Sequence, residues 1–151
     1  MARLPLQAET ALPVGAHAAP ANSGNRRETR PFFRQIRKSA HESGTPVVPV
    51  GGNTGLAAGT YGEGAIMLSL DRMDAIREIR PAARLAVVEA GVILSALHDA
   101  TEPYGLSFPM TFGAKGSARV GGFLSTNAGG SNVLRYGNTR DLVLGIEVVL
   151  A

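Results

Sequence analysis

Glycine and small polar residues crowd into one segment of this chain, residues 113–137, whose sequence is GAKGSARVGGFLSTNAGGSNVLRYG. Glycine loses more backbone freedom on folding than any other residue, so such a segment is kept mainly where the chain bends sharply or approaches a ligand closely. The short side chains of Ser117, Ser125, Thr126 and Asn127 supply hydrogen-bonding groups between the glycines. The segment is therefore typical of a loop and not of an ordinary core element.

A second segment of the same character lies upstream, at residues 49–56, with the sequence PVGGNTGL. Both segments follow an apolar run, which favours loops whose backbone N–H groups point at an anion such as a pyrophosphate. Taken alone, either loop fits a structural turn as well as a ligand cradle, and only the pair favours the cradle. Neither has the spacing of a P-loop or of the Gly-x-Gly-x-x-Gly dinucleotide fingerprint.

Composition limits the classes of function. The chain has 151 residues, of which 44% are hydrophobic and 18% charged, as in one small globular domain. It contains no cysteine, so disulfides, thiolate catalysis, iron–sulfur clusters and cysteine-ligated zinc are excluded within it. The lack of cysteine agrees with a reducing cytoplasm, and we expect a cytoplasmic location. We expect no membrane span, because no apolar run reaches the ~20 residues that one needs.

The formal charge of +3 comes partly from a basic cluster within residues 26–38. Such a cluster fits a nucleic-acid contact or a solvated helix face. Because no known nucleic-acid motif accompanies it, we favour the helix face and expect no nucleic-acid partner.

Periodicity and chain breakers predict an α/β (α+β) fold. Residues 1–28 have neither a helical nor a strand period and are expected to be a disordered or poorly packed segment, followed by a folded domain over residues 29–151. Helices are expected over residues 29–44 and 92–104, with a short one inside the glycine-rich segment. Strands are expected at residues 45–50, 65–70, 75–79, 85–90 and 142–150. The third and fourth of these strands should form a hairpin.

Resemblance to a known family adds to this interpretation. The sequence VVPVGGNTGL, at residues 47–56, looks like the first FAD-pyrophosphate loop of the vanillyl-alcohol oxidase/p-cresol methylhydroxylase family. The motifs GAKGS, GG, TNAGG and LRYGN, within residues 113–138, resemble the second flavin-binding segment of its 2-hydroxy-acid dehydrogenase branch. That branch includes enzymes that oxidise D-lactate, D-2-hydroxyglutarate and glycolate. The resemblance covers residues 29–151, and the two motifs in this order are highly specific.

The resemblance implies an FAD-binding domain, with its first subdomain and the start of the second, and FAD between them. The first loop would wrap the diphosphate of FAD through Gly51, Gly52, Asn53, Thr54, Gly55 and Leu56. The second would line the flavin and its ribityl chain through Gly113, Ala114, Ser117, Gly121 and Gly122. The cradle would be completed by Thr126, Asn127, Gly129 and Gly130. Some relatives attach FAD covalently through a histidine in the first loop. Asn53 and no histidine lies in this one, so we expect FAD to be non-covalent.

The remaining ionisable side chains offer little chemistry. His17, His41 and His98 have no second histidine at metal-binding spacing, so we expect no metal ligand and no catalytic residue in this chain. Lys115 and Arg119 fit a surface role as well as a contact to cofactor phosphate.

Two positions are of separate interest. Phe123 stands where the family often has asparagine, so its ring is expected to crowd the cofactor or to remove a polar contact. Glu89 lies at the end of an expected strand and is expected to face solvent.

The resemblance implies the N-terminal portion of an enzyme that moves a hydride from a 2-hydroxy acid to FAD and produces a 2-oxo acid. The family's second half, which carries the substrate-binding domain, has no counterpart here, so we expect a fragment that is incomplete for catalysis. Two alternatives remain. One is a non-catalytic flavin- or nucleotide-binding module that acts with a partner chain, and the other is an inactive truncated product.

Overall fold

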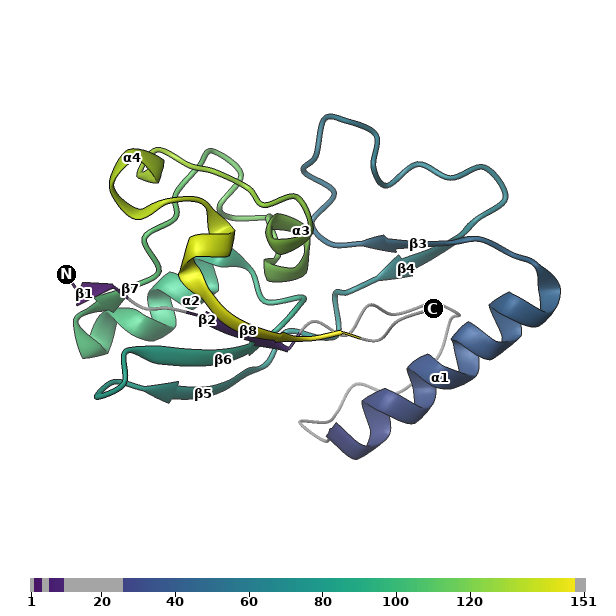
Figure 1. Cartoon of the computed structure of the whole chain (residues 1–151), viewed down its shortest axis with the longest axis horizontal. Helices are drawn as coiled ribbons and strands as arrows, with labels where there is room; N and C mark the ends of the chain where they lie inside the picture. Colours follow the sequence, from purple (N-terminus) through teal and green to yellow (C-terminus); the bar gives the residue numbers. More distant parts are fainter. Residues whose placement is uncertain (1, 4–5, 10–25, 149–151) are drawn as a thin grey trace.

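The computed structural model describes residues 2–3, 6–9 and 26–148, which form a mixed α/β domain (Figure 1). Its largest sheet has the strand order β5-β6-β2-β8. The bounds of these strands are Ile76–Arg80, Leu85–Glu89, Leu6–Glu9 and Val143–Glu147. β5 and β6 form an antiparallel hairpin, whereas β2 runs parallel to both of its neighbours. The expected hairpin and the α/β fold class are confirmed.

A separate two-stranded parallel sheet pairs β3 (Val47–Val50) with β4 (Ile66–Ser69), and α1 (Arg26–Ser43) leads into it. Parallel neighbours cannot be joined by a tight turn, so the chain leaves β3 in a long loop, residues 51–65, before it enters β4 (Figure 1). α1 ends where Gly44 takes the left-handed conformation, with φ 63°. The expected helix and both expected strands are confirmed, although the helix begins earlier, at Arg26.

The hydrophobic core lies between β6, α2 (Leu94–Thr101) and α3 (Val120–Ser125). The ring of Phe123, on α3, is buried and stacks on that of Phe108 with 6.0 Å between the centroids. It therefore points into the core, so the expectation that it would crowd a cofactor is wrong. The remaining short elements are β1 (Ala2–Arg3), η1 (Glu102–Tyr104), β7 (Leu106–Ser107), α4 (Val133–Tyr136) and η2 (Thr139–Leu142).

The N-terminal residues depart from expectation. β2 lies inside the four-stranded sheet, between β6 and β8, and β1 pairs with β7. The expectation of a disordered or poorly packed segment over residues 1–28 is therefore wrong for these two strands. Both are too short to display a two-residue period, and their partners are far away in the sequence. Residues 10–25 lie outside the described part of the chain.

Three backbone segments meet where the two larger sheets adjoin, and we call them the junction: residues 70–73, 90–92 and 119–121. The amide of Gly91 donates to the carbonyl oxygen of Met73 at 2.7 Å, and that of Gly121 donates to Ala90 at 2.7 Å. A β-carbon on Gly91 would clash with the carbonyl oxygens of Leu70 and Met73. Only glycine allows this approach, so the junction fixes how β3 and β4 lie against β6 and α3.

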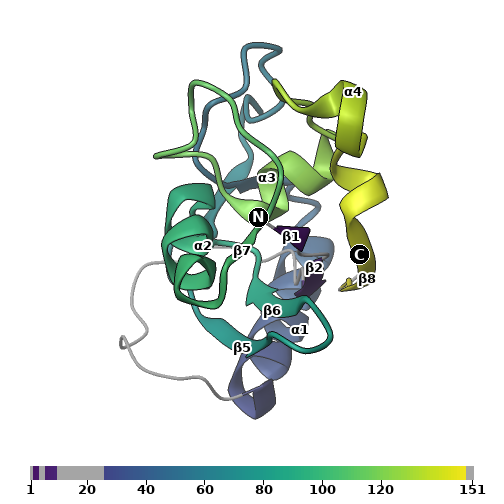
Figure 2. The ribbon, with the colours of Figure 1, turned by 90° about the vertical axis from the view of Figure 1, so that its left-hand side faces the viewer.

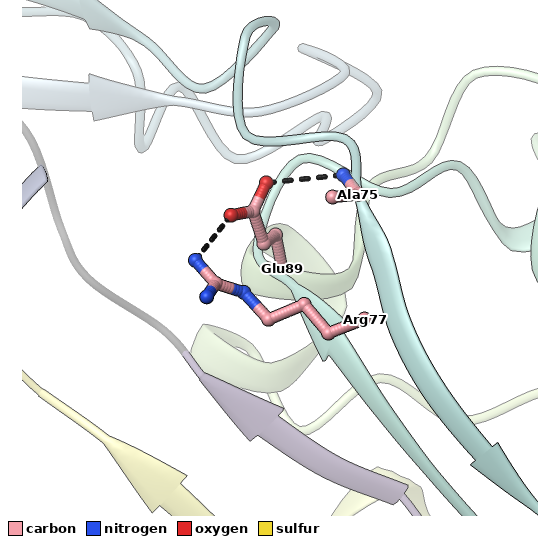
Figure 3. A network of polar contacts seen from close by, with 3 residues as sticks. All are labelled: Ala75, Arg77 and Glu89. Carbon is pink, nitrogen blue, oxygen red and sulfur yellow. Dashed lines mark hydrogen bonds and ion pairs between the residues drawn. The ribbon is translucent and has the colours of Figure 1, made fainter. Parts of the chain in front are cut away.

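A buried ion pair lies beside the junction (Figure 3). Glu89 Oε1 pairs with Nη2 of Arg77 at 2.5 Å, and Oε2 accepts a hydrogen bond from the amide of Ala75 at 3.0 Å. The side chain of Arg77 is only 14% exposed and that of Glu89 only 6%. The expectation that Glu89 faces solvent is therefore wrong. The carboxylate ties the start of the β5–β6 hairpin to its end.

We predict that Glu89→Gln lowers the free energy of unfolding by about 3 kcal/mol, because it removes one charge of a buried pair and leaves the other desolvated. Chemical denaturation monitored by circular dichroism measures this change. Glu78→Gln is the matched control, since Glu78 pairs with Arg80 on the same hairpin but both side chains are largely exposed. An equal loss of stability in the two variants would contradict the structural role of the buried pair.

Candidate functional site

The first loop leaves the carboxyl end of β3 and carries the first set of candidate residues. Its residues 53–59 are exposed, and Gly51 and Gly52 are half-buried. Of the hydrogen bonds between described residues, none is donated by a backbone amide of residues 51–56. A run of unpartnered amides in one loop can bind an oxyanion.

The first loop is braced by its own side chains. Asn53 takes a left-handed backbone conformation, with φ 50°. Its Oδ1 accepts a hydrogen bond of 2.7 Å from Oγ1 of Thr60, and the amide of Tyr61 donates to the carbonyl oxygen of Ala58 at 2.9 Å. Asn53 therefore has a structural role in the loop, and its side-chain amide nitrogen has no hydrogen-bond partner among the described residues.

The second segment turns tightly before α3 begins. The amides of Ser117 and Ala118 both donate to the carbonyl oxygen of Ala114, at 2.9 and 2.8 Å. The amides of Gly113, Ala114 and Gly122 donate to none of the described residues. The turn thus presents a second group of unpartnered amides, and Figures 1 and 2 show both loops on the same side of the molecule.

The two loops touch through their backbones. A β-carbon on Gly52 would clash with the carbonyl oxygen of Ser117 and lie 3.2 Å from Cα of Ala118. One on Gly51 would lie 3.7 Å from the amide nitrogen of Gly122. Segments more than sixty residues apart in sequence are thereby brought together, as the cradle hypothesis requires.

The candidate glycines fall into two groups. A β-carbon on Gly55, Gly113 or Gly122 would meet nothing within 4 Å. One on Gly121 would press on Ala90 and Leu70, and one on Gly130 would clash with the carbonyl oxygen of Thr111. The first group borders open space and the second allows close packing. Open space beside unpartnered amides can accommodate a phosphate-bearing cofactor, and Gly55, Gly113 and Gly122 border such space.

The third set of candidate residues follows α3. Oγ1 of Thr126 donates to the carbonyl oxygen of Gly122 at 3.1 Å, so this residue closes α3. Asn127 is left-handed, with φ 47°, and its Oδ1 accepts from the amide of Arg140 at 3.0 Å. No described acceptor receives a hydrogen bond from the amides of Gly129 and Gly130. This set thus joins the second loop through Gly122 while the asparagine fixes the turn.

The two basic residues of the second loop differ in their surroundings. Lys115 is exposed. The side chain of Arg119 is only 16% exposed, and its guanidinium contacts Asp71 and the carbonyl oxygen of Gly91. The charge of Arg119 is therefore paired within the protein. The sequence did not predict this ion pair, because Asp71 is far away in the chain.

His98 makes a contact to the backbone. The residue is half-buried, and its Nε2 lies 2.9 Å from the carbonyl oxygen of Phe108. Among the described residues, no group of three or more histidine, aspartate or glutamate side chains is arranged to hold a metal ion. Every helix in this part of the chain falls short of the length and apolarity of a membrane crossing.

Comparison with known proteins bears on this site. A family model described as an FAD binding domain matches residues 32–151. D-2-hydroxyglutarate dehydrogenase of Xanthomonas citri pv. viticola is 43% identical over 111 residues, covering 73% of this chain and 24% of that protein. D-lactate dehydrogenase of Archaeoglobus fulgidus is 45% identical over 117 residues, covering 77% and 26%. The chain spans about a quarter of the length of these relatives.

Another relative bears on location. The mitochondrial D-2-hydroxyglutarate dehydrogenase of Bos taurus is 43% identical over 119 residues, covering 77% of this chain and 22% of that protein. This relative is named as mitochondrial, whereas the two bacterial and archaeal relatives above carry no compartment in their names. The expectation of a cytoplasmic location stays a prediction.

Solved structures support the fold. An alkyldihydroxyacetonephosphate synthase structure superposes with a TM-score of 0.65 at 18% identity, covering 74% of this chain and 21% of that one. The family match covers most of the chain, and the relatives bear the names that the sequence resemblance implies. The chain therefore belongs to the FAD binding domain family, with the fold of the vanillyl-alcohol oxidase/p-cresol methylhydroxylase type.

Proposed function

We propose that the two loops bind the diphosphate of FAD through their backbone amides. The observation that carries this proposal is the contact of Gly52 with Ser117 and Ala118, because it brings two groups of unpartnered amides side by side. Exposed Lys115 belongs to the second loop and would add a positive charge to this segment. Gly122, whose α-carbon borders open space, would admit the cofactor where a larger residue would not.

We further propose that the chain is the FAD-binding portion of an oxidoreductase that acts on a 2-hydroxy acid. Relatives named for D-2-hydroxyglutarate and D-lactate support this substrate class. Bound FAD would supply the ring that accepts a hydride as the hydroxy acid becomes a 2-oxo acid. The residues of this chain would hold and orient the cofactor. The rest of the relatives' length, in the same polypeptide or in a partner chain, would complete the substrate site.

Glycine variants separate binding from folding. We predict that Gly122→Val weakens FAD binding by roughly tenfold or more, since the new side chain occupies the cofactor's space. Its unfolding midpoint should fall little, because a β-carbon there meets nothing within 4 Å. Gly52→Ala should lower both FAD affinity and the unfolding midpoint, because its β-carbon clashes with the backbone of Ser117. Titration with FAD followed by flavin fluorescence, alongside thermal unfolding, measures both quantities.

Gly145→Ala is the control for these variants. Gly145 lies on β8 and its β-carbon would also meet open space, but it is not in either loop. FAD affinity should be unchanged in this variant. If Gly122→Val bound FAD as tightly as the parent chain, the open side of the second loop would not be the cofactor site.

We predict that FAD leaves the protein on denaturation. The first loop carries Asn53 and no histidine through which the flavin could be linked covalently. Acid precipitation of the FAD-loaded chain should therefore release all of the yellow colour into the supernatant. Flavin that stayed with the precipitated protein would contradict non-covalent binding.

We also predict that this chain alone binds FAD without turning over D-lactate or D-2-hydroxyglutarate, because it spans about a quarter of the relatives named for these substrates. Anaerobic addition of either acid should leave the visible flavin absorbance unchanged. Bleaching of that absorbance would show that the chain needs no further segment for the reaction.

A further inference from the structure

Arg119 connects the three segments of the junction. Its Nη2 lies 2.8 Å from Oδ1 of Asp71, which follows β4, and its Nη1 donates to the carbonyl oxygen of Gly91 at 2.6 Å. The residue itself immediately precedes α3, in the second loop. One guanidinium thus contacts Gly91, which lies 28 residues earlier in the chain, and Asp71, which lies earlier still.

The stem of Arg119 also contacts the first loop. A β-carbon on Gly51 would lie 3.5 Å from the β-carbon of Arg119, so the first loop rests against this side chain. β3, which carries that loop, is anchored at its end by the bond from the amide of Leu70 to the carbonyl oxygen of Val50 at 2.9 Å. Asp71 directly follows Leu70. A displacement of Asp71 would therefore be transmitted through Leu70 and this hydrogen bond to Val50, at the base of the first loop.

We propose that Arg119, with Asp71 as its anionic partner, is the positioning residue that holds the two FAD-binding loops in register. This inference rests on the proposed function and adds a role for side chains that do not touch the cofactor. The pair acts on cofactor affinity through the distance between the two groups of amides.

Arginine suits this role better than lysine. Its planar fork reaches a carboxylate and a carbonyl oxygen at once, whereas an ammonium on a flexible stem does not fix two directions. The Nε atom of Arg119 is buried without a hydrogen-bond partner among the described residues. The remaining two bonds must therefore offset that loss, and the orientation of the guanidinium depends on both of them.

The test is a double-mutant cycle on FAD affinity in the full chain. Asp71→Asn should weaken FAD binding roughly threefold, as expected for a half-exposed ion pair. Arg119→Gln should weaken it roughly tenfold or more, because hydrogen bonds of a charged group are lost. Adding Asp71→Asn to Arg119→Gln should have no further effect. Arg119→Lys should restore only part of the affinity.

A second measurement does not depend on FAD. In the cofactor-free chain, Asp71→Asn should speed hydrogen exchange at the amides of Gly91 and Gly121, which bond across the junction. Amides in the β5–β6 hairpin should keep their protection. This local pattern separates positioning from a general loss of stability, which would speed exchange everywhere.

Arg80→Gln is the matched control. Arg80 also pairs with a carboxylate, that of Glu78 at 2.6 Å, but it lies on the hairpin at the other end of the molecule from the loops (Figures 1 and 2). It should change neither FAD affinity nor exchange at the junction.

The outcomes distinguish the two proposals. Equal effects of Asp71→Asn with and without Arg119, or unchanged exchange at Gly91 and Gly121, would overturn the positioning role. A parent chain that binds no FAD would overturn the proposed function, and the exchange measurement alone would then decide whether Arg119 and Asp71 hold the loops.

Discussion

Contact between backbones at glycine positions is the constraint on which the rest of this structure depends. At Gly91 the chain passes against the carbonyl oxygens of Leu70 and Met73, and at Gly52 it passes against Ser117. No side chain fits into either contact. These approaches join the small β3–β4 sheet to the larger sheet and its helices, and they set the distance between the two candidate loops.

The junction also explains why charged groups are buried close to it. Glu89 ends β6 just before Gly91, and its carboxylate is satisfied by Arg77 and by the amide of Ala75. Arg119 reaches Gly91 from the opposite loop. A buried backbone turn at glycine leaves some carbonyl oxygens and amides without a backbone hydrogen-bond partner. Long polar side chains from neighbouring elements can then form hydrogen bonds with these groups, as Arg119 does with the carbonyl oxygen of Gly91. At Gly91, close backbone packing and the hydrogen bond from Arg119 therefore occur together.

Local signals were enough to predict most of the helices and strands. Gly44 ends α1, and Gly105, with φ 65°, closes the turn after α2, as their positions in the sequence indicate. The β5–β6 hairpin follows from two short strand candidates, at residues 75–79 and 85–90, with a proline turn between them. The location of the candidate loops was predicted in the same way, from glycine density after apolar runs, and both segments lie within the residues that the family model matches.

Long-range pairings were not accessible from the sequence. β2 takes its place between β6 and β8 through partners that no local period reveals, and the burial of Glu89 depends on Arg77 across the hairpin. Likewise, nothing near Arg119 indicates Asp71 as its partner. Such contacts are decided by tertiary packing, which overrides what a short window of sequence can show.

Glycine density therefore has two physical causes in one segment, and they make different demands. A β-carbon on Gly121 or Gly130 would press on protein atoms, whereas one on Gly113 or Gly122 would meet nothing within 4 Å. Packing explains the first pair completely. The second pair has no such packing explanation among the described residues, and the same is true of Gly145, which lies on β8 and outside both loops. What sets Gly113 and Gly122 apart is their place beside unpartnered amides, where the proposed cofactor would occupy the open space, so these positions test the proposed function more directly than the crowded ones.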